Sequence, residues 1–295
     1  MHSTAPSPPT TILRPLLRVV YPIFMLVVLN GVGVWLVASG YPRHLLVLVL
    51  VVAIGASFLV ERVIPYNEHW NQSHDDVGRD WTHFLVNEVA NVASVSALPL
   101  VAGLAPWGGL WPSGWPLAVQ LGLAILVLDF GVTITHWASH RIPLLWRFHA
   151  VHHSVKRHYG FNGLMKHPVH QAIELTVGVA PLVVLGIPPG VASLLALATA
   201  IQLLLQHSNA DYATGPMGYV LALNKGHRFH HQKWPGIGDV NFGLFTNLWD
   251  FLLGTWSFDE KRRFTSDDFG IGDEPDYPTG YWDQLTAPFR PKARS

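Results

Sequence analysis

Histidines gather in two short stretches of this chain with a shared spacing. The stretch HWASHRIPLLWRFHAVHHS at 136–154 begins with two histidines four residues apart and ends with a trio at i, i+3 and i+4, which GHRFHHQ at 226–232 repeats. On a helix, both spacings place the imidazoles on one face. The eight residues are His136, His140, His149, His152, His153, His227, His230 and His231. Because imidazole binds zinc, copper, iron and nickel, the pattern predicts a metal site.

The number of histidines favours two ions over one. The last two residues of each trio diverge by about 100° on a helix, so one helix can supply ligands to two neighbouring ions. His207 adds a ninth imidazole, with Asp211 four residues later as a possible further ligand. A structural zinc ion needs only four ligands, and the chain has neither Cys nor an HExxH zinc-protease motif. The apolar segments hold too few histidines to bind haem from both sides, which leaves two oxygen-activating irons.

Two aspartates are candidate hydrogen-bonding partners of the ligands. Asp129 lies seven residues before His136, two turns along the same predicted helix face. A carboxylate near the end of an apolar span is costly unless it is paired, and accepting a hydrogen bond from a ligand imidazole would fix the tautomer of that ring. Asp250, in NFGLFTNLWDFLLGT, is a second candidate for this role.

The composition is that of a membrane protein. Hydrophobic residues make up 49% of the 295 residues and charged residues 13%, against about 25% charged in an average soluble domain. The mean hydropathy is +0.27. With a formal net charge of zero and no long basic run, the chain has no electrostatic basis for binding nucleic acid.

Six apolar segments are candidate membrane spans, since a span needs about 20 apolar residues. They cover residues 19–37, 45–60, 89–105, 117–135, 172–187 and 190–206. The third contains Pro99, and the last two are short and form a predicted helical hairpin. The first is too long for the apolar core of a signal peptide, so we interpret it as a retained helix. The sequence therefore predicts an all-α, multi-pass bundle of four to six spans with a histidine-rich helical cap.

The charge distribution predicts the orientation of this bundle. With a cytoplasmic N-terminus and six spans, every Lys and Arg except Arg43 falls on the cytoplasmic side, as the positive-inside rule requires. The histidine segments fall on that side too. We expect a multi-pass protein of the bacterial inner membrane with its histidine site on the cytoplasmic face.

Six segments between about residues 125 and 256 carry a resemblance to a known family. They are DFGVTITHWASH (129–140), LWRFHAVHHS (145–154), KHP (166–168), QHSN (206–209), HRFHHQ (227–232) and residues 241–255, in the family's order. In these segments the chain resembles the fatty acid hydroxylase/sterol desaturase superfamily of membrane di-iron enzymes. The resemblance implies a catalytic domain at 125–256. The apolar segments and the charges around it predict a cytosolic segment at 1–18, a transmembrane region at 19–124 and a cytosolic tail at 257–295.

The resemblance implies an oxygen-dependent oxidoreductase that hydroxylates a C–H bond of a lipid, such as a fatty acyl chain or a sterol. It assigns two iron ions, which zinc can replace in a purified sample, to the nine histidines. A tenth ligand stays open among Asp211, His158, His167 and His170, of which His167 belongs to the KHP segment. Because the chain has no Cys for an iron–sulfur cluster and no phosphate-binding glycine loop, the electrons must come from a separate donor protein.

Two other functions compete with lipid hydroxylation. A lipid desaturase would use the same ions, and only the placement of the substrate separates the two reactions. A histidine-rich metal transporter would place its ligands near the middle of the bilayer. Here the histidines lie beyond the ends of the predicted spans, which argues against transport.

Overall fold

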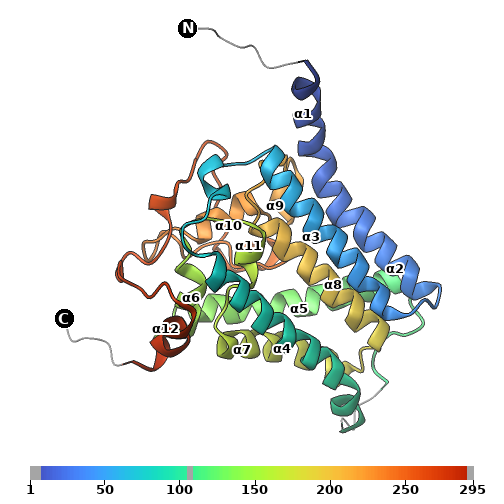
Figure 1. Ribbon diagram of the computed structural model, residues 1–295. Helices are drawn as coiled ribbons and strands as arrows, with labels where there is room; N and C mark the ends of the chain where they lie inside the picture. Colours follow the sequence, from blue (N-terminus) through green and yellow to red (C-terminus); the bar gives the residue numbers. More distant parts are fainter. Residues whose placement is uncertain (1–7, 105–108, 291–295) are drawn as a thin grey trace.

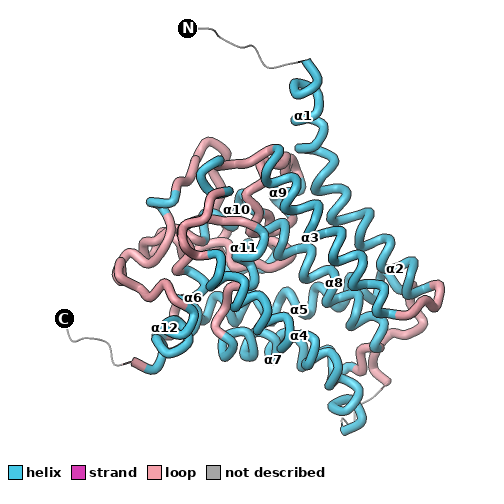
Figure 2. The backbone as a smooth tube through the Cα atoms, viewed as in Figure 1, coloured by secondary structure: helices cyan, strands magenta, loops and turns pink. Residues whose placement is uncertain are grey.

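The computed structural model describes residues 8–104 and 109–290 of the chain. Its regular structure in these ranges is helical, apart from three isolated β-bridges, as Figure 2 shows. The predicted all-α fold is therefore confirmed for these residues. Parts of three predicted segments lie outside the described residues: 1–7 at the N-terminus, 105 in the third predicted span, and 291–295 in the tail.

The first two spans form a hairpin. Helix α1 (Pro8–Ile23) continues through a π-helical turn (Phe24–Leu29) into α2 (Asn30–Ala38). The chain reverses at Gly40, whose φ of 75° favours glycine, and α3 (Leu46–Val63) runs back. The outer faces of these helices expose many Leu and Val side chains, which suits contact with lipid acyl chains.

Helix α8 (Pro189–Gln206) is the most enclosed of the long apolar helices. Of its most apolar 18-residue window, 67% is buried, against 28–44% in the other four candidate spans. It packs on α2, α3 and α5, and Figure 1 shows it running alongside α3. A helix that is apolar on all sides is expected in this central position.

Helices α5 (Leu117–Ser139) and α7 (Pro168–Leu185) pack against each other through two glycines. A methyl group added at Gly131 would lie 2.6 Å from the Cα atom of Gly178. The two backbones can approach this closely only because neither residue has a side chain. This contact brings the end of α5, where His136 lies, next to the start of α7.

Among the described residues, five helices are long and apolar enough to cross a membrane, which agrees with the predicted four to six spans. They are Leu13–Ala38, Arg43–Val63, Leu117–Ser139, Pro168–Leu185 and Pro189–Gln206. Residues 89–104 of the third predicted span belong to α4 (Val77–Leu104), which is not among the five. Near the start of α4, Asp80 accepts a hydrogen bond from Asn162, so α4 begins at the end of the bundle where α5 finishes.

Short helices and loops cover that end of the bundle and form the cap (Figure 1). They are α6 (Pro143–His153), the 3₁₀ turn Gly160–Leu164, α9 (Met217–Val220), α10 (Asn224–His230), α11 (Leu248–Leu253) and α12 (Tyr281–Thr286). Two of them, α6 and α10, carry the histidine trios. The long helices therefore serve as a support that holds the histidine-bearing helices at one end.

Candidate metal centre

Nine imidazoles form two groups in the cap. Within each group, one possible ligand atom from every residue lies within 4.8 Å of the others. The first histidine group consists of His136, His140, His149, His153 and His230. The second histidine group consists of His152, His207, His227 and His231. The groups are adjacent, since the rings of His153 and His231 stack at a centroid distance of 4.7 Å.

Helices α6 and α10 each supply both groups. In α6, His153 belongs to the first group and its neighbour His152 to the second. In α10, His230 belongs to the first group, while His227 and the capping residue His231 belong to the second. Consecutive residues of a helix point about 100° apart, so one helix end can serve two sites.

The remaining ligand candidates come from the ends of two long helices. His136 lies in the last turn of α5, and His140 is the C-terminal capping residue of that helix. His207 caps α8 in the same way. After α5 ends at Ser139, the chain enters α6 at Pro143, the first helical position, where no backbone N–H is needed. Rigid helices thus fix where each imidazole enters the cap.

The Nε2 atoms of the first histidine group converge on His153. Three of them lie 2.9–3.1 Å from His153 Nε2, those of His140, His149 and His230. Nδ1 of His140 lies 2.8 Å from Asp239 Oδ1, and Nδ1 of His230 lies 2.9 Å from the Val240 carbonyl oxygen. These acceptors require a proton on Nδ1, which leaves a lone pair on each Nε2. Lone pairs that face one another repel, and a cation between them removes the repulsion.

A backbone acceptor also faces Nδ1 of His136 in the first group and of His152 in the second. Nδ1 of His136 donates to the Phe242 carbonyl oxygen at 2.9 Å, while its buried Nε2 has no hydrogen-bond partner. In the second group, Nδ1 of His152 faces the Met165 carbonyl oxygen at 3.2 Å. Nε2 of His227 lies 2.9 Å from Nε2 of His207. Neutral imidazoles with convergent lone pairs fit two cations held by nitrogen.

The groups that hold these rings were not predicted from the sequence. Asp239 lies in a loop with no helical spacing to His140, so no periodicity connects the two residues. The other acceptors are backbone carbonyl groups, of Met165, Val240 and Phe242. Every residue has such a carbonyl, and only the fold selects the ones that face an imidazole.

Comparison with known proteins covers the histidine segments. The fatty acid hydroxylase family model matches residues 121–255. Ornithine lipid hydroxylase OlsE of Rhizobium tropici is 34% identical over 245 residues, which span 80% of this chain and 73% of that protein. The chain belongs to the fatty acid hydroxylase family. Alkylglycerol monooxygenase of Danio rerio is 30% identical over 155 residues, 52% of this chain and 32% of that protein. No solved structure matches the chain.

Membership in this family confirms the resemblance inferred from the histidine segments. Relatives with this sequence similarity are named hydroxylases and monooxygenases of lipids. The protein is therefore an oxidoreductase of the lipid hydroxylase type, and its apolar helices make it a membrane protein. This result favours an enzyme over the transporter considered above.

In this protein the Asp129 carboxylate holds a loop and contacts no imidazole, which corrects the predicted contact. Its carboxylate accepts hydrogen bonds from the backbone N–H groups of Leu244, Phe245 and Thr246, at 2.7–3.1 Å. It also accepts one from Thr246 Oγ1 at 2.7 Å. The effect on the ligands is indirect, because this loop begins at Phe242, whose carbonyl oxygen accepts from His136.

Asp250 holds the other end of the same loop. Its carboxylate accepts hydrogen bonds at 2.8 Å from the backbone N–H groups of Phe242 and Gly243. Thr255 Oγ1 donates to Asp250 at 2.7 Å. Both aspartates therefore help to position the Phe242 carbonyl group, which orients the His136 ring.

Asp211, one of the candidates for a further ligand, lies outside both histidine groups. Its carboxylate pairs with Arg18 at 3.1 Å, and its side chain is 22% exposed. Helix α8 ends at Gln206, so the four-residue spacing from His207 is not a helical one. The predicted alignment of Asp211 with the metal site therefore fails at the end of the helix.

Replacing Asp211 with Ala should leave the metal content and the activity unchanged. The lost ion pair is partly exposed, so the cost in stability should be only about 0–1 kcal/mol. Metal analysis of the purified variant beside the wild type tests this expectation. If the variant bound fewer ions per chain than the wild type, Asp211 would have to be considered a ligand.

Two further histidines considered as ligands serve other roles. His167 caps the start of α7: its Nδ1 accepts from the backbone N–H of Val169 at 3.1 Å, and its Nε2 faces the Leu285 carbonyl oxygen at 3.0 Å. Both ring nitrogens are thus engaged away from the metal centre. His170 lies behind His149 at a centroid distance of 4.5 Å, with its Nε2 2.9 Å from Ser139 Oγ.

Burial keeps the imidazoles outside the spans neutral, and this sets a dependence on pH. Burial lowers the pKa of His149, His152 and His153 well below the model-compound value of 6.5, and lowers the pKa of His207 to about 3. Below about pH 6.5 the unfolded chain therefore binds protons that the folded chain does not, so acid favours unfolding. The melting temperature of chelator-treated protein in detergent should fall between pH 7.5 and 5.5. A melting temperature that stays constant or rises on acidification would contradict this.

Proposed function

We propose that this fatty acid hydroxylase holds two iron ions, one in each histidine group, and inserts one atom of dioxygen into a C–H bond of a membrane lipid. The observation that carries the proposal is the convergence of neutral imidazole nitrogens on two adjacent points in the cap. Imidazole suits iron among several metals, so the donor set agrees with iron. Zinc accepts the same ligands and can replace iron in a purified sample.

The reaction balances with an external source of electrons. A substrate R–H, dioxygen, two electrons and two protons give R–OH and water. Two ferrous ions, when bound, supply the redox chemistry that activates dioxygen. The chain contains no Cys to hold an iron–sulfur cluster, so we assign the electrons to a separate donor protein.

The chain's own contribution is to orient the ligands. Asp239 and the Val240 carbonyl group hold the Nδ1 protons of His140 and His230, which fixes the direction of both Nε2 lone pairs. Hydrogen bonds of this kind strengthen and aim a metal-binding imidazole. Burial of the second group, every member of which is at most 3% exposed, keeps bulk water away from the reacting atoms.

The first histidine group comes closest to the surface at His140, and we assign substrate entry to this edge. The side chain of His140 is 4% exposed, but that of its partner Asp239 is 34% exposed. The ring of Trp146 packs 5.1 Å from His140, and the neighbouring Ile142 and Leu144 are exposed. Apolar side chains beside the metal centre suit a lipid that enters from the bilayer.

We assign the cap to the cytoplasmic face of the membrane. The positive-inside rule supports this side, since the cap contains Lys156, Arg157 and Lys166 between two candidate spans. A bacterial relative that modifies a lipid supports the inner membrane as the location. On that side the enzyme has access to soluble electron donors.

The experiment is lipid analysis in cells. The chain would be expressed in a bacterial strain that makes ornithine lipids, because the relative that covers most of this chain is named for that substrate. Wild-type enzyme should produce a lipid heavier by one oxygen, and so should His44→Ala, which alters an exposed histidine far from both groups in sequence. His152→Ala should not. A product lighter by two hydrogens would establish desaturation instead, and an unchanged lipid profile would contradict the proposal.

A further inference from the structure

His158 is a buried histidine that belongs to neither group. Its side chain is 0% exposed, and neither Nδ1 nor Nε2 has a hydrogen-bond partner. Among the histidines of the described residues, it is the one buried ring in which both nitrogens lack a partner. Buried polar atoms are nearly always hydrogen-bonded, so two buried nitrogens without a hydrogen-bond partner require an explanation, such as a bound ion.

The ring lies beside the second histidine group at the spacing of a further member. Its centroid is 4.5 Å from that of His231, 5.5 Å from that of His207 and 6.1 Å from that of His227. The four rings of the group itself lie 4.4–6.2 Å from one another. His158 is therefore as close to three of these rings as they are to each other.

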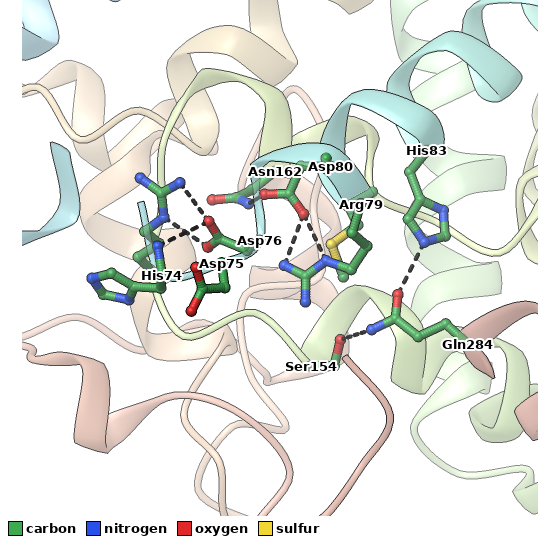
Figure 3. Close-up of polar contacts among 12 residues, drawn as sticks. His74, Asp75, Asp76, Arg79, Asp80, His83, Ser154, Asn162 and Gln284 are labelled. Atoms are coloured by element: carbon green, nitrogen blue, oxygen red, sulfur yellow. Dashed lines mark hydrogen bonds and ion pairs between the residues drawn. The ribbon is translucent and has the colours of Figure 1, made fainter. Parts of the chain in front are cut away.

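Ionic contacts fix the backbone on both sides of His158. Arg157 donates to both carboxylate oxygens of Asp76, at 2.8 and 2.7 Å. Tyr159 donates from its hydroxyl group to Asp80 at 2.8 Å. Figure 3 shows Asp76 and Asp80 near each other at the start of α4, with Asn162 directed at Asp80. The segment that carries His158 is thus attached to the bundle at two points.

Aromatic rings close the other side of His158. Phe269 stacks on the imidazole at a centroid distance of 4.7 Å and an interplanar angle of 27°. Trp70 lies 6.0 Å away, and both aromatic side chains are fully buried. Phe269 offers no hydrogen bond, and Trp70 donates its indole N–H to Ser266. The rings of the second histidine group lie on the other side of His158.

We propose that His158 supplies a fifth nitrogen ligand to the ion held by the second histidine group. The inference rests on the proposed two-ion site and adds a residue to it. The His158 nitrogens are not among the four that lie within 4.8 Å of one another, so binding requires the ring to move toward the ion. The second group then has five nitrogens, as the first group has already. Asp211 and His167, two of the other candidates, are engaged elsewhere, and the third, His170, lies beside His149 of the first group.

The test is an anaerobic titration of the full-length protein, purified in detergent and stripped of metal, with cobalt(II). Bound ions per chain, their affinities and the visible absorption per cobalt would be measured for the wild type, His158→Gln and His158→Gly. The matched control is His83→Gln, because His83 is also buried but uses both ring nitrogens, toward Lys166 and Gln284.

Wild type and His83→Gln should bind two ions with the same affinities. His158→Gln should keep one affinity and weaken the other at least about tenfold, with stronger absorption per cobalt because an ion with fewer ligands absorbs more. Added imidazole should restore the weak site in His158→Gly, which a purely structural role would not allow.

Two outcomes would overturn the assignment. One is a His158→Gln protein with two unchanged affinities and an unchanged spectrum. The other is equal loss of both ions in His158→Gly without recovery in imidazole. Fewer than two ions in the wild type would instead contradict the two-ion proposal itself, so the two failures are distinguishable.

Discussion

Replacing His153 with Ala should remove one ion from the protein and lower the activity more than about 100-fold. His153 lies at the centre of the first histidine group, with the Nε2 atoms of His140, His149 and His230 within 3.1 Å of its own Nε2. Loss of a group that only supports a ligand already costs about 10–100-fold in metal affinity or activity, so loss of a central ligand should exceed that range.

The measurement is iron per chain together with the rate of lipid hydroxylation, in the wild type, His153→Ala and His44→Ala. The His44 variant removes an exposed imidazole that belongs to neither group, so it should retain two ions and full activity. A His153→Ala protein that still binds two irons would remove the first histidine group from the proposed site.

Replacing Asp129 with Ala should weaken the first ion although Asp129 touches no imidazole. The substitution leaves three backbone N–H groups without their acceptor: those of Leu244 and Phe245, which are buried, and that of Thr246, which is partly buried. Each stranded group costs about 1–3 kcal/mol, so the loop should rearrange. The Phe242 carbonyl group then no longer fixes Nδ1 of His136. We expect a lower melting temperature and at least about tenfold weaker binding of one ion.

Asp129→Asn is the matched control for this change. The amide keeps one oxygen acceptor and nearly the same volume, so Asn should fall between Ala and the wild type in both melting temperature and metal affinity. Binding of two ions by Asp129→Ala with wild-type affinities would show that the loop does not control the site.

Much of the fold and of the clustering of the histidines could be predicted from local sequence patterns. Apolar length identifies spans because a bilayer imposes a fixed thickness on each helix. The i, i+3, i+4 spacing places His149, His152 and His153 along one face, and α6 carries all three into the two histidine groups. Such predictions hold where one regular helix contains all the residues concerned.

Prediction fails where the chain leaves the helix. Asp211 was aligned with His207 by a helical spacing, but the helix ends at Gln206. Asp239 supports His140 from a loop 99 residues away in sequence, where no periodicity operates. Asp129 was expected to meet a ligand on its own helix, whereas its hydrogen bonds go to a distant loop. Long-range contacts of this kind depend on how the helices pack together.

The most direct test of the account is a single reconstitution. The purified protein would be stripped of metal, loaded anaerobically with ferrous iron, supplied with electrons and lipid, and then given ¹⁸O-labelled dioxygen. If the two-iron proposal is right, the protein binds two irons per chain and the lipid product carries one ¹⁸O atom. One iron or none per chain, or a hydroxylated lipid without the label, would contradict it.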